Sequence, residues 1–179
     1  MWAFIVLYGS MVCRLTVGKK KYADVSDELT AILERTEDLR SELTFLIEKD
    51  AQAFDQVMDA TKMPKADEFQ INQRNAKIQE ATILATSVPL EVMEKAAAVL
   101  EILPVIAEKG NVNSVSDVGV ANLMANSAVK GAFMNVRINL PGLEDEKLKN
   151  EFADKADALL KKAVKLFEQT DKIVSSKLG

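Results

Sequence analysis

Residues 26–57 decide the architecture of this chain, and they read SDELTAILERTEDLRSELTFLIEKDAQAFDQV. Apolar side chains recur every three or four residues, the spacing that aligns them along one face of an α-helix. The aligned positions are Leu29, Ile32, Thr36, Leu39, Leu43, Leu46, Asp50, Ala53 and Val57. Ser26, followed by two acidic residues, is expected to cap the start of this helix, and Met63-Pro64 marks its end. The stretch therefore predicts one long amphipathic helix.

Helical spacing continues through most of the chain, and no stretch alternates for long enough to be a strand. Further helices are expected at residues 66–86, 89–109, 116–140 and from 144 onward. Because proline interrupts helical hydrogen bonding, Pro89 should start or kink a helix, and Pro104 should kink or break it. Gly110 is expected to act as a stop.

The helix expected at 116–140 has a seam of small residues and amides, which lets another helix approach closely. The seam positions are Ala121, Ala125, Ala128, Ala132, Asn135 and Asn139. These patterns predict an all-α, multihelical bundle of five or six long helices, with residues 1–179 forming a single domain. Since long helices with sustained seams often pack on a partner chain, we expect a dimer.

Composition restricts the chemistry and the partners. The chain has 179 residues, no histidine, one cysteine and a net charge of −4, so we expect no metal site and no nucleic-acid partner. Trp2–Val12 is almost wholly apolar but shorter than the roughly 20 residues that span a bilayer, and no basic leader precedes it. We read it as a buried helix followed by a buried Cys13. We expect a cytoplasmic protein without membrane contact.

Asp50 is the clearest anomaly, because it occupies a position in the apolar seam of the long helix. Burial of a carboxylate is costly unless it is paired, and burial raises its pKa, which suits a general acid or base. The alternative is a structural aspartate that makes an ion pair or hydrogen bonds at the edge of the seam.

Two polar clusters lie beside expected helix ends, the first at the end of one helix and the second at the start of another. Lys19-Lys20-Lys21 would either interact with a helix end or bind an anionic group. Asn113, Ser114, Ser116 and Asp117 stand at a helix start, where free backbone N–H groups bind polar ligands. Capping by Ser116 explains part of this second cluster and leaves the asparagines unexplained.

Asn135 and Asn139 extend the small-residue seam, while Arg137 lies roughly opposite them. Buried amides form either a polar pocket or a structural network. Asp117 and Arg137 are 20 residues apart, which is about 30 Å along one helix. They cannot line one compact site in one subunit unless the helix breaks, so we predict a site near the interface of an antiparallel dimer.

Four segments together resemble the formiminotetrahydrofolate cyclodeaminase and methenyltetrahydrofolate cyclohydrolase family. They are Thr16-Val17-Gly18-Lys19-Lys20-Lys21-Tyr22, Asp50-Ala51-Gln52-Ala53-Phe54, Asn111–Gly119 and Asn135-Val136-Arg137-Ile138-Asn139. The resemblance runs from about Met11 to the C-terminus in the same order and spacing. It implies a dimeric all-helical folate enzyme that uses a tetrahydrofolate derivative as substrate and needs no cofactor.

The resemblance implies roles for the candidate residues. Asp50 is the first candidate for the catalytic proton-transfer group and Asp117 the second. Substrate-binding roles fall on Lys19, Lys20, Lys21, Tyr22, Asn113, Ser114, Ser116, Asn135, Arg137 and Asn139. The lysines and Arg137 would hold the carboxylates of the folate's glutamate, and Asn113, Ser114 and Asn135 would bind the pterin edge.

The N-terminus departs from the family pattern. Members carry a Pro-Thr-Pro-Gly-Gly-Gly-Ser type motif, whereas Met1–Ser10 here is bulky and apolar, so we expect a truncated or divergent start. The leading expectation is a cyclodeaminase that converts 5-formiminotetrahydrofolate to 5,10-methenyltetrahydrofolate and releases ammonia, with a possible formiminotransferase partner. The alternatives are a methenyltetrahydrofolate cyclohydrolase, a folate-binding homologue with impaired turnover, and a helical scaffold.

Overall fold

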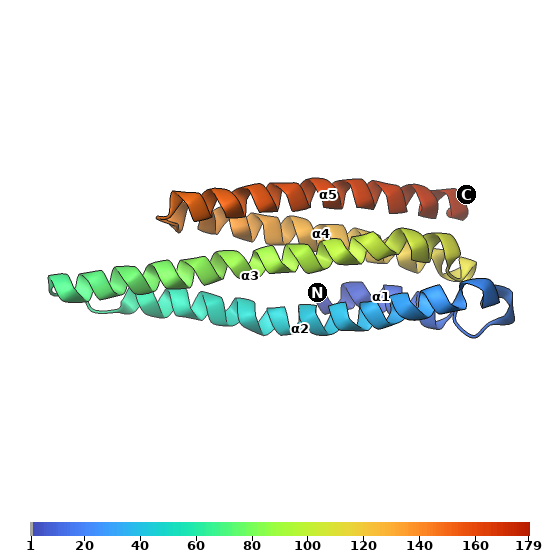
Figure 1. Cartoon of the computed structure of the whole chain (residues 1–179), viewed down its shortest axis with the longest axis horizontal. Helices are drawn as coiled ribbons and strands as arrows, with labels where there is room; N and C mark the ends of the chain where they lie inside the picture. Colours follow the sequence, from blue (N-terminus) through green and yellow to red (C-terminus); the bar gives the residue numbers. More distant parts are fainter. Residues whose placement is uncertain (1) are drawn as a thin grey trace.

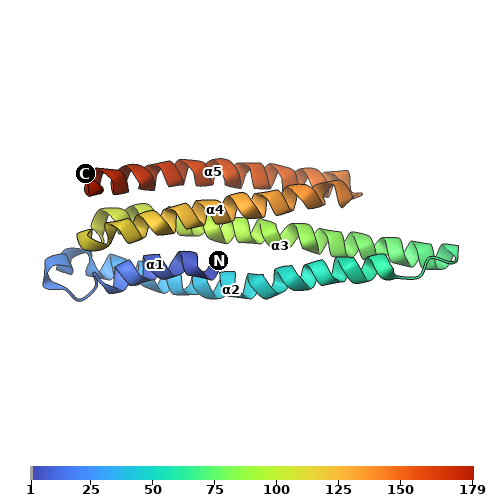
Figure 2. The same ribbon diagram turned by 180° about the vertical axis from the view of Figure 1, so that it is seen from behind.

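The computed structural model describes residues 2–179, with side chains from Val6 onward. Five α-helices run parallel or antiparallel to one another and form an elongated bundle (Figures 1 and 2). They are α1 (Trp2–Arg14), α2 (Ser26–Lys62), α3 (Glu68–Lys109), α4 (Val115–Asn139) and α5 (Glu146–Leu178). Short 3-10 segments occupy Lys20–Val25, which is kinked at Tyr22, Val112–Ser114 and Leu140–Gly142. The all-α prediction is confirmed, since residues 2–179 contain no strand.

Helix α2 confirms the long amphipathic helix predicted at residues 26–57. Six of its seam positions are buried: Leu29, Thr36, Leu39, Leu43, Leu46 and Ala53. The predicted cap at Ser26 is wrong. The 3-10 turn that ends at Val25 leads directly into α2, so Ser26 already has helical backbone angles of φ −62° and ψ −44°. Its carbonyl oxygen accepts a hydrogen bond from the Thr30 hydroxyl, and no side chain caps this end.

Helix α3 corrects the prediction of two helices divided near Pro89. It is continuous over 42 residues, and both Pro89 and Pro104 lie buried inside it. A proline removes only one backbone donor, and α3 packs against all four other helices, which hold it in place. The predicted end is correct, although Gly110 has φ −70° and is not a left-handed cap. Glycine is required there because a Cβ would lie 2.5 Å from the Ile106 carbonyl oxygen and 2.9 Å from Val12 Cγ1.

The small-residue seam of α4 is buried as predicted. Ala121, Ala125, Ala128 and Ala132 are each at most 2% exposed, and α4 packs against α3, α5 and α1. Small side chains allow helix axes to approach to about 8 Å. Helix α5 begins after Asp145, whose carboxylate accepts hydrogen bonds from the backbone N–H groups of Lys147 and Leu148.

The α1 helix is buried on one side only. Val6, Val12 and Cys13 are fully buried, whereas Leu7 and Met11, and Leu15 just after the helix, are exposed. Burial raises the pKa of the Cys13 thiol to about 11, so the residue stays neutral and packs as a small apolar group. The side chains of Trp2–Ile5 lie outside the described residues. Within the part of the chain that is described, no helix combines the length and apolar content needed to cross a membrane.

Close packing through α4 yields a stability prediction. We expect Ala125→Leu to lower the free energy of unfolding by about 1–3 kcal/mol, because the added side chain has no space in a fully buried contact. The matched control is Ala158→Leu, at an exposed position of α5, which should change it by less than about 0.5 kcal/mol. Urea denaturation of both variants measures the difference, and equal effects would show that the seam is loosely packed.

Candidate functional site

A cavity of about 370 Å³ opens between α2, α3 and α4 and contains three of the predicted site residues. Asp50 lies on α2, and Asn135 and Asn139 lie on α4. The remaining lining residues are Phe54, Val57, Ala85 and Ile138. Two segments separated by 85 residues in sequence therefore meet at one cavity, which combines a carboxylate, two amides and an apolar wall.

Asp50 is half-buried, and burial raises the pKa of its carboxyl group above the ordinary 3.8. Within the described part of the chain, no side chain donates a hydrogen bond to this carboxylate. Neighbouring Lys49 is instead engaged with Glu91 on α3, at 2.7 Å. Asp50 is therefore a carboxylate without a cationic partner at the edge of a cavity, an arrangement that suits proton transfer near neutral pH.

Asn139 satisfies a backbone group that a proline leaves free. Pro89 has no N–H to donate to the carbonyl of Ala85 one turn earlier in α3. The side-chain amide of Asn139 donates to that carbonyl oxygen at 2.7 Å. Since Ala85 and Asn139 both line the cavity, this hydrogen bond fixes its wall. The amide N–H of Asn139 is thus engaged in a structural contact, one of the two roles that the sequence left open.

Asn135 does not lie as the seam pattern predicts, whereas Arg137 lies on another side of α4, as predicted. Asn135 is exposed at the edge of the cavity rather than packed, so its amide is free to contact a ligand. Arg137 is exposed elsewhere on α4, with its guanidinium carbon 5.9 Å from the centre of the Phe133 ring. It does not line the cavity.

The lysine segment and the start of α4 form a second cluster. The Tyr22 hydroxyl donates to Asn111 Oδ1 at 3.5 Å and accepts from the Val112 backbone N–H at 3.3 Å. Thr16 Oγ1 accepts from the Asn111 backbone N–H at 2.8 Å. These contacts hold the turn between α3 and α4 against the segment after α1. Lys19, Lys20 and Lys21 are exposed beside this junction.

The start of α4 departs from the predicted capping. Ser116 is exposed inside the helix, and the N-cap is Ser114, which is buried but makes no side-chain capping bond. The side-chain cap belongs to the preceding 3-10 turn, where Asn111 Oδ1 accepts a hydrogen bond from the backbone N–H of Asn113 at 3.2 Å. Asn113 is exposed and Asp117 is half-buried.

The two clusters lie at opposite ends of α4. This helix is continuous over 25 residues, a length of about 37 Å at 1.5 Å per residue. Asp117 and the lysines therefore do not share a site with Asp50, Asn135 and Asn139 within one copy of the chain. The sequence-based distance argument between Asp117 and Arg137 is confirmed, because the helix does not break.

Sequence reasoning missed the apolar lining and a second pair of amides. Asn122 and Asn126 are the buried asparagines of α4, at 1% and 8% exposure. Asn122 Nδ2 donates to the Phe167 carbonyl of α5 at 3.0 Å. Their spacing of four residues repeats that of Asn135 and Asn139, and this repeat was the available signal. The sequence contains no comparable signal for Phe54 and Ile138, because exposed apolar residues on helices are common.

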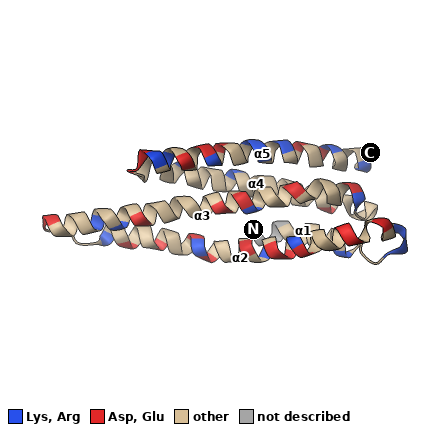
Figure 3. Cartoon of the chain, in the orientation of Figure 1, with Lys and Arg blue, Asp and Glu red and all other residues tan. Residues whose placement is uncertain are grey.

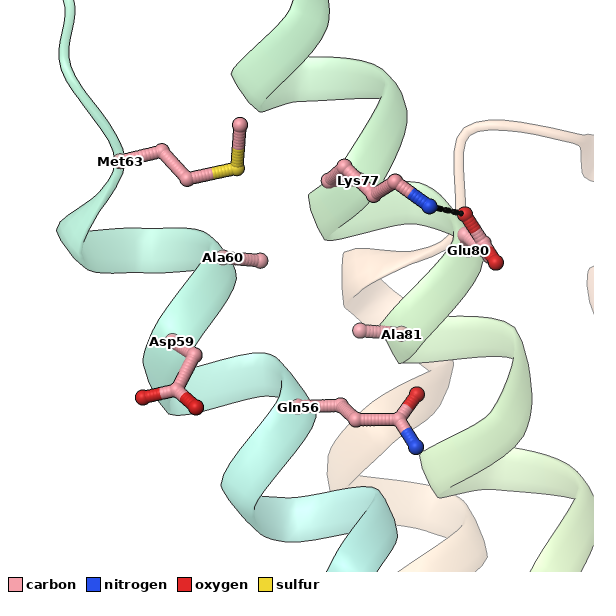
Figure 4. A pocket seen from close by; sticks show the side chains of 7 residues that line it. All are labelled: Gln56, Asp59, Ala60, Met63, Lys77, Glu80 and Ala81. Atoms are coloured by element: carbon pink, nitrogen blue, oxygen red, sulfur yellow. Dashed lines mark hydrogen bonds and ion pairs between the residues drawn. The ribbon is translucent and has the colours of Figure 1, made fainter.

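A second cavity, of about 290 Å³, lies between the end of α2 and the start of α3 (Figure 4). It is lined by Gln56, Asp59, Ala60, Met63, Lys77, Glu80 and Ala81. None of these was predicted as a site residue, and the charged Lys77 and Glu80 pair with each other. Among the described residues, no group of histidine, cysteine or acidic side chains is arranged to hold a metal ion. The Asp50 cavity is therefore the better candidate.

Comparison with known proteins links this geometry to one family. A family model described as formiminotransferase-cyclodeaminase matches residues 4–158. A methenyltetrahydrofolate cyclohydrolase of Methylorubrum extorquens is 43% identical over 170 residues, covering 95% of this chain and 82% of that protein. The formimidoyltransferase-cyclodeaminase of Rattus norvegicus is 29% identical, and the match covers 86% of this chain but only 28% of that protein.

A solved structure agrees with these matches. The crystal structure of formiminotetrahydrofolate cyclodeaminase from Thermotoga maritima superposes with a TM-score of 0.89 at 28% sequence identity. The superposition covers 99% of this chain and 85% of that chain.

The contact between Asn139 and Ala85 can be tested by a double-mutant cycle. We expect Asn139→Ala to lower the free energy of unfolding by about 1–3 kcal/mol, because the Ala85 carbonyl is left without a donor. In a Pro89→Ala background, the restored N–H of residue 89 can donate to this carbonyl, so the same substitution should cost less. Urea denaturation of the four proteins measures the coupling. Equal costs in both backgrounds would contradict the assignment.

Proposed function

The chain belongs to the formiminotransferase-cyclodeaminase family, and we propose that it acts as a methenyltetrahydrofolate cyclohydrolase. The supporting observation is the relative of that name, which is 43% identical and matches most of both chains. Relatives named formimidoyltransferase-cyclodeaminase are 29–30% identical and match under a third of their own length. The order in which the sequence ranked the two activities is therefore reversed.

Cyclodeaminase activity remains the second candidate. It is supported by the Thermotoga maritima cyclodeaminase, whose structure matches over 99% of this chain. The two reactions make similar demands on a site, since each involves a tetrahedral carbon bonded to folate nitrogen and a proton transfer. The Asp50 cavity suits either reaction on these grounds.

In the proposed hydrolysis, Asp50 acts as the proton-transfer group. The carboxylate takes a proton from a water molecule while the oxygen of that water bonds to the methenyl carbon. This addition gives a tetrahedral carbon between the two folate nitrogens. The bond from this carbon to N5 then breaks as the protonated Asp50 gives its proton to N5, and the hydroxyl group on the carbon releases its proton to solvent, which leaves 10-formyltetrahydrofolate. The raised pKa of Asp50 helps the second step, because a larger fraction of its carboxyl group is protonated than in an ordinary aspartate at the same pH.

The other cavity residues take supporting roles in this proposal. Phe54 and Ile138 are 63% and 77% exposed at its edge, and they offer an apolar surface to the folate rings. The exposed amide of Asn135 is placed to bind the pterin edge. Asn139 acts as a positioning residue, since its amide N–H is engaged with the Ala85 carbonyl.

The second cluster enters the proposal as the carboxylate-binding end of the site. Lys19, Lys20 and Lys21 carry exposed ammonium groups that suit the glutamate of the folate. Because α4 separates them from Asp50 by about 37 Å, we propose a homodimer with the site near the subunit interface. If the chain is a cyclodeaminase, we expect a formiminotransferase partner. A cytoplasmic location stays a prediction.

Absorbance in the methenyltetrahydrofolate band tests the reaction. We expect purified protein to remove supplied 5,10-methenyltetrahydrofolate faster than a buffer control. Formation of this band from 5-formiminotetrahydrofolate, with release of ammonia, would instead establish a cyclodeaminase. A well-folded protein that does neither would be a folate-binding or scaffold homologue, and the proposed activity would be wrong.

Replacing Asp50 by asparagine separates catalysis from folding. We expect turnover to fall by about 10²–10⁴-fold, as is usual on loss of a general acid–base group, while folate binding persists. The pKa of Asp50 is higher in the folded state, so the wild type loses stability as pH rises from the ordinary 3.8 through the folded-state pKa. Asp50→Asn removes this loss and should raise stability slightly at pH 7, and the gain stays small because the partial exposure of Asp50 weakens the effect of burial on its charge.

The matched control for this test is Asp59→Asn, in the same helix, where the carboxylate side chain is 79% exposed. It should leave both turnover and the urea midpoint unchanged. Unchanged turnover in Asp50→Asn would remove Asp50 from the mechanism.

A further inference from the structure

One glutamine of α3 is hydrogen-bonded through both ends of its side-chain amide to the turn between α4 and α5. Gln79 Nε2 donates to the Gly142 carbonyl oxygen at 3.0 Å. Gln79 Oε1 accepts from the backbone N–H of Glu144, also at 3.0 Å. We call these two bonds the Gln79 clamp. Because both partners are backbone groups on either side of Leu143, the clamp holds the main chain of the turn.

The turn lies directly on α3 beside this glutamine. A Cβ added at Gly142 would lie 3.2 Å from Thr82 Cγ2, closer than an ordinary van der Waals contact. Leu140 and Leu143 on either side of the glycine are buried. Their burial draws the turn onto the bundle, but apolar burial is non-directional and does not fix the position of the turn along α3.

Directional contacts to the turn come from the Gln79 clamp. Residues 140–143 are uncharged, and the acidic residues begin only at the start of α5 (Figure 3), so ion pairs do not hold this segment. Hydrogen bonds require defined distances and angles. The two bonds of the Gln79 amide therefore set the height of the turn along α3.

The end of α4 is attached to α3 at two points. The first is the bond from Asn139 to the Ala85 carbonyl oxygen, at 2.7 Å, and the second is the Gln79 clamp. Gln79 and Ala85 are six residues apart, which is about 9 Å along α3 at 1.5 Å per residue. A single point would let the last turn of α4 pivot, whereas two points along one helix fix both its position and its direction.

The last turn of α4 is also one wall of the candidate site. Asn135, Ile138 and Asn139 line the cavity that contains Asp50. Asp50 itself lies on α2, whereas the Leu140–Gly142 segment packs against α3, α4 and α5. Displacement of the turn therefore moves the α4 wall of the cavity and leaves the carboxylate in place.

From these observations we propose that Gln79 is a positioning residue for the folate site. Its amide holds the turn, the turn holds the end of α4, and the end of α4 presents the Asn135 amide and the Ile138 side chain to the substrate. The identity of the substrate rests on the proposed function. The placement of α4 by Gln79 does not, and it can be measured without folate.

Gln79→Met tests the substrate side of this proposal. Methionine has a similar length and helix propensity but no amide, so both bonds are lost while the helix is kept. We expect KM for 5,10-methenyltetrahydrofolate to rise about tenfold, equivalent to one ordinary hydrogen bond to the substrate, because Asn135 is displaced. We expect kcat to stay within about twofold of the wild-type value, because Asp50 does not move.

The matched control is Gln73→Met, at an exposed position of the same helix, which should leave both constants unchanged. Steady-state rates at a series of substrate concentrations measure KM and kcat for the three proteins. A merely structural role of Gln79 would reduce the amount of folded enzyme, which lowers the apparent kcat and leaves KM unchanged.

A double-mutant cycle in urea tests the placement of α4 without folate. If the Gln79 clamp holds Asn139 at the Ala85 carbonyl, then loss of the clamp weakens that bond before Asn139 is replaced. Asn139→Ala should therefore lower the urea midpoint in Gln79→Met by at most about half as much as in the wild type. In the Gln73→Met background it should lower the midpoint by the full wild-type amount.

Equal midpoint shifts in Gln79→Met and the wild type, or an unchanged KM in Gln79→Met, would overturn the proposal. If circular dichroism shows that Gln79→Met has lost helix, Gln79→Glu takes its place with the same expectations. Its carboxylate can still accept from the Glu144 N–H but cannot donate to the Gly142 carbonyl. A wild type without turnover would contradict the proposed function alone, since the cycle in urea would still decide whether Gln79 places α4.

Discussion

Enclosure of α3 by the other four helices is the constraint on which the rest of the structure depends. Nearly half of the buried residues in the core lie on this helix or on the α4 seam that packs against it. Small alanine side chains bring α4 close to α3, and leucines of α2 fill the opposite side. Because tertiary contacts hold the part of α3 that contains both prolines, where buried residues run from Ala81 to Ala107, the helix continues through two prolines that would interrupt an isolated helix.

The same constraint reaches the candidate site through one backbone carbonyl. Pro89 leaves the Ala85 oxygen without its helical donor, and a buried unpaired carbonyl is costly. Asn139 supplies the donor from α4. The need for a donor to the Ala85 carbonyl thus fixes the Asn139 amide at the edge of the cavity that contains Asp50. The cavity wall is therefore held by the packed helices of the bundle.

Charge is distributed unevenly over the bundle. Lysines and glutamates pair across helices, as in Lys49 with Glu91 and Lys155 with Glu94, and such exposed pairs contribute little stability. Asp50 is half-buried without a cationic partner, and the outer side of α4 is nearly free of charge. The unpaired Asp50 lowers the stability of an isolated subunit, and the apolar outer side of α4 lowers its solubility. In the proposed function, Asp50 acts on the folate and the outer side of α4 is available to a second copy.

The sequence by itself determined the helical class, the bounds of α2 and α4, the buried alanine seam and Asp50 as the anomalous residue, because each follows from local periodicity. It also gave the separation of Asp117 from Arg137, which depends only on the rise of one helix. The sequence-based predictions were wrong about a helix boundary at Pro89, about the capping residues of α2 and α4, and about burial of Asn135, which is exposed. Only the tertiary structure decided that α3 is continuous and that Asp50 lines the same cavity as Asn135 and Asn139. It also decided that the side chain of Asn139 donates a hydrogen bond to the Ala85 carbonyl. These facts depend on which helix supplies a neighbour across space, and spacing along one helix carries no information about that neighbour.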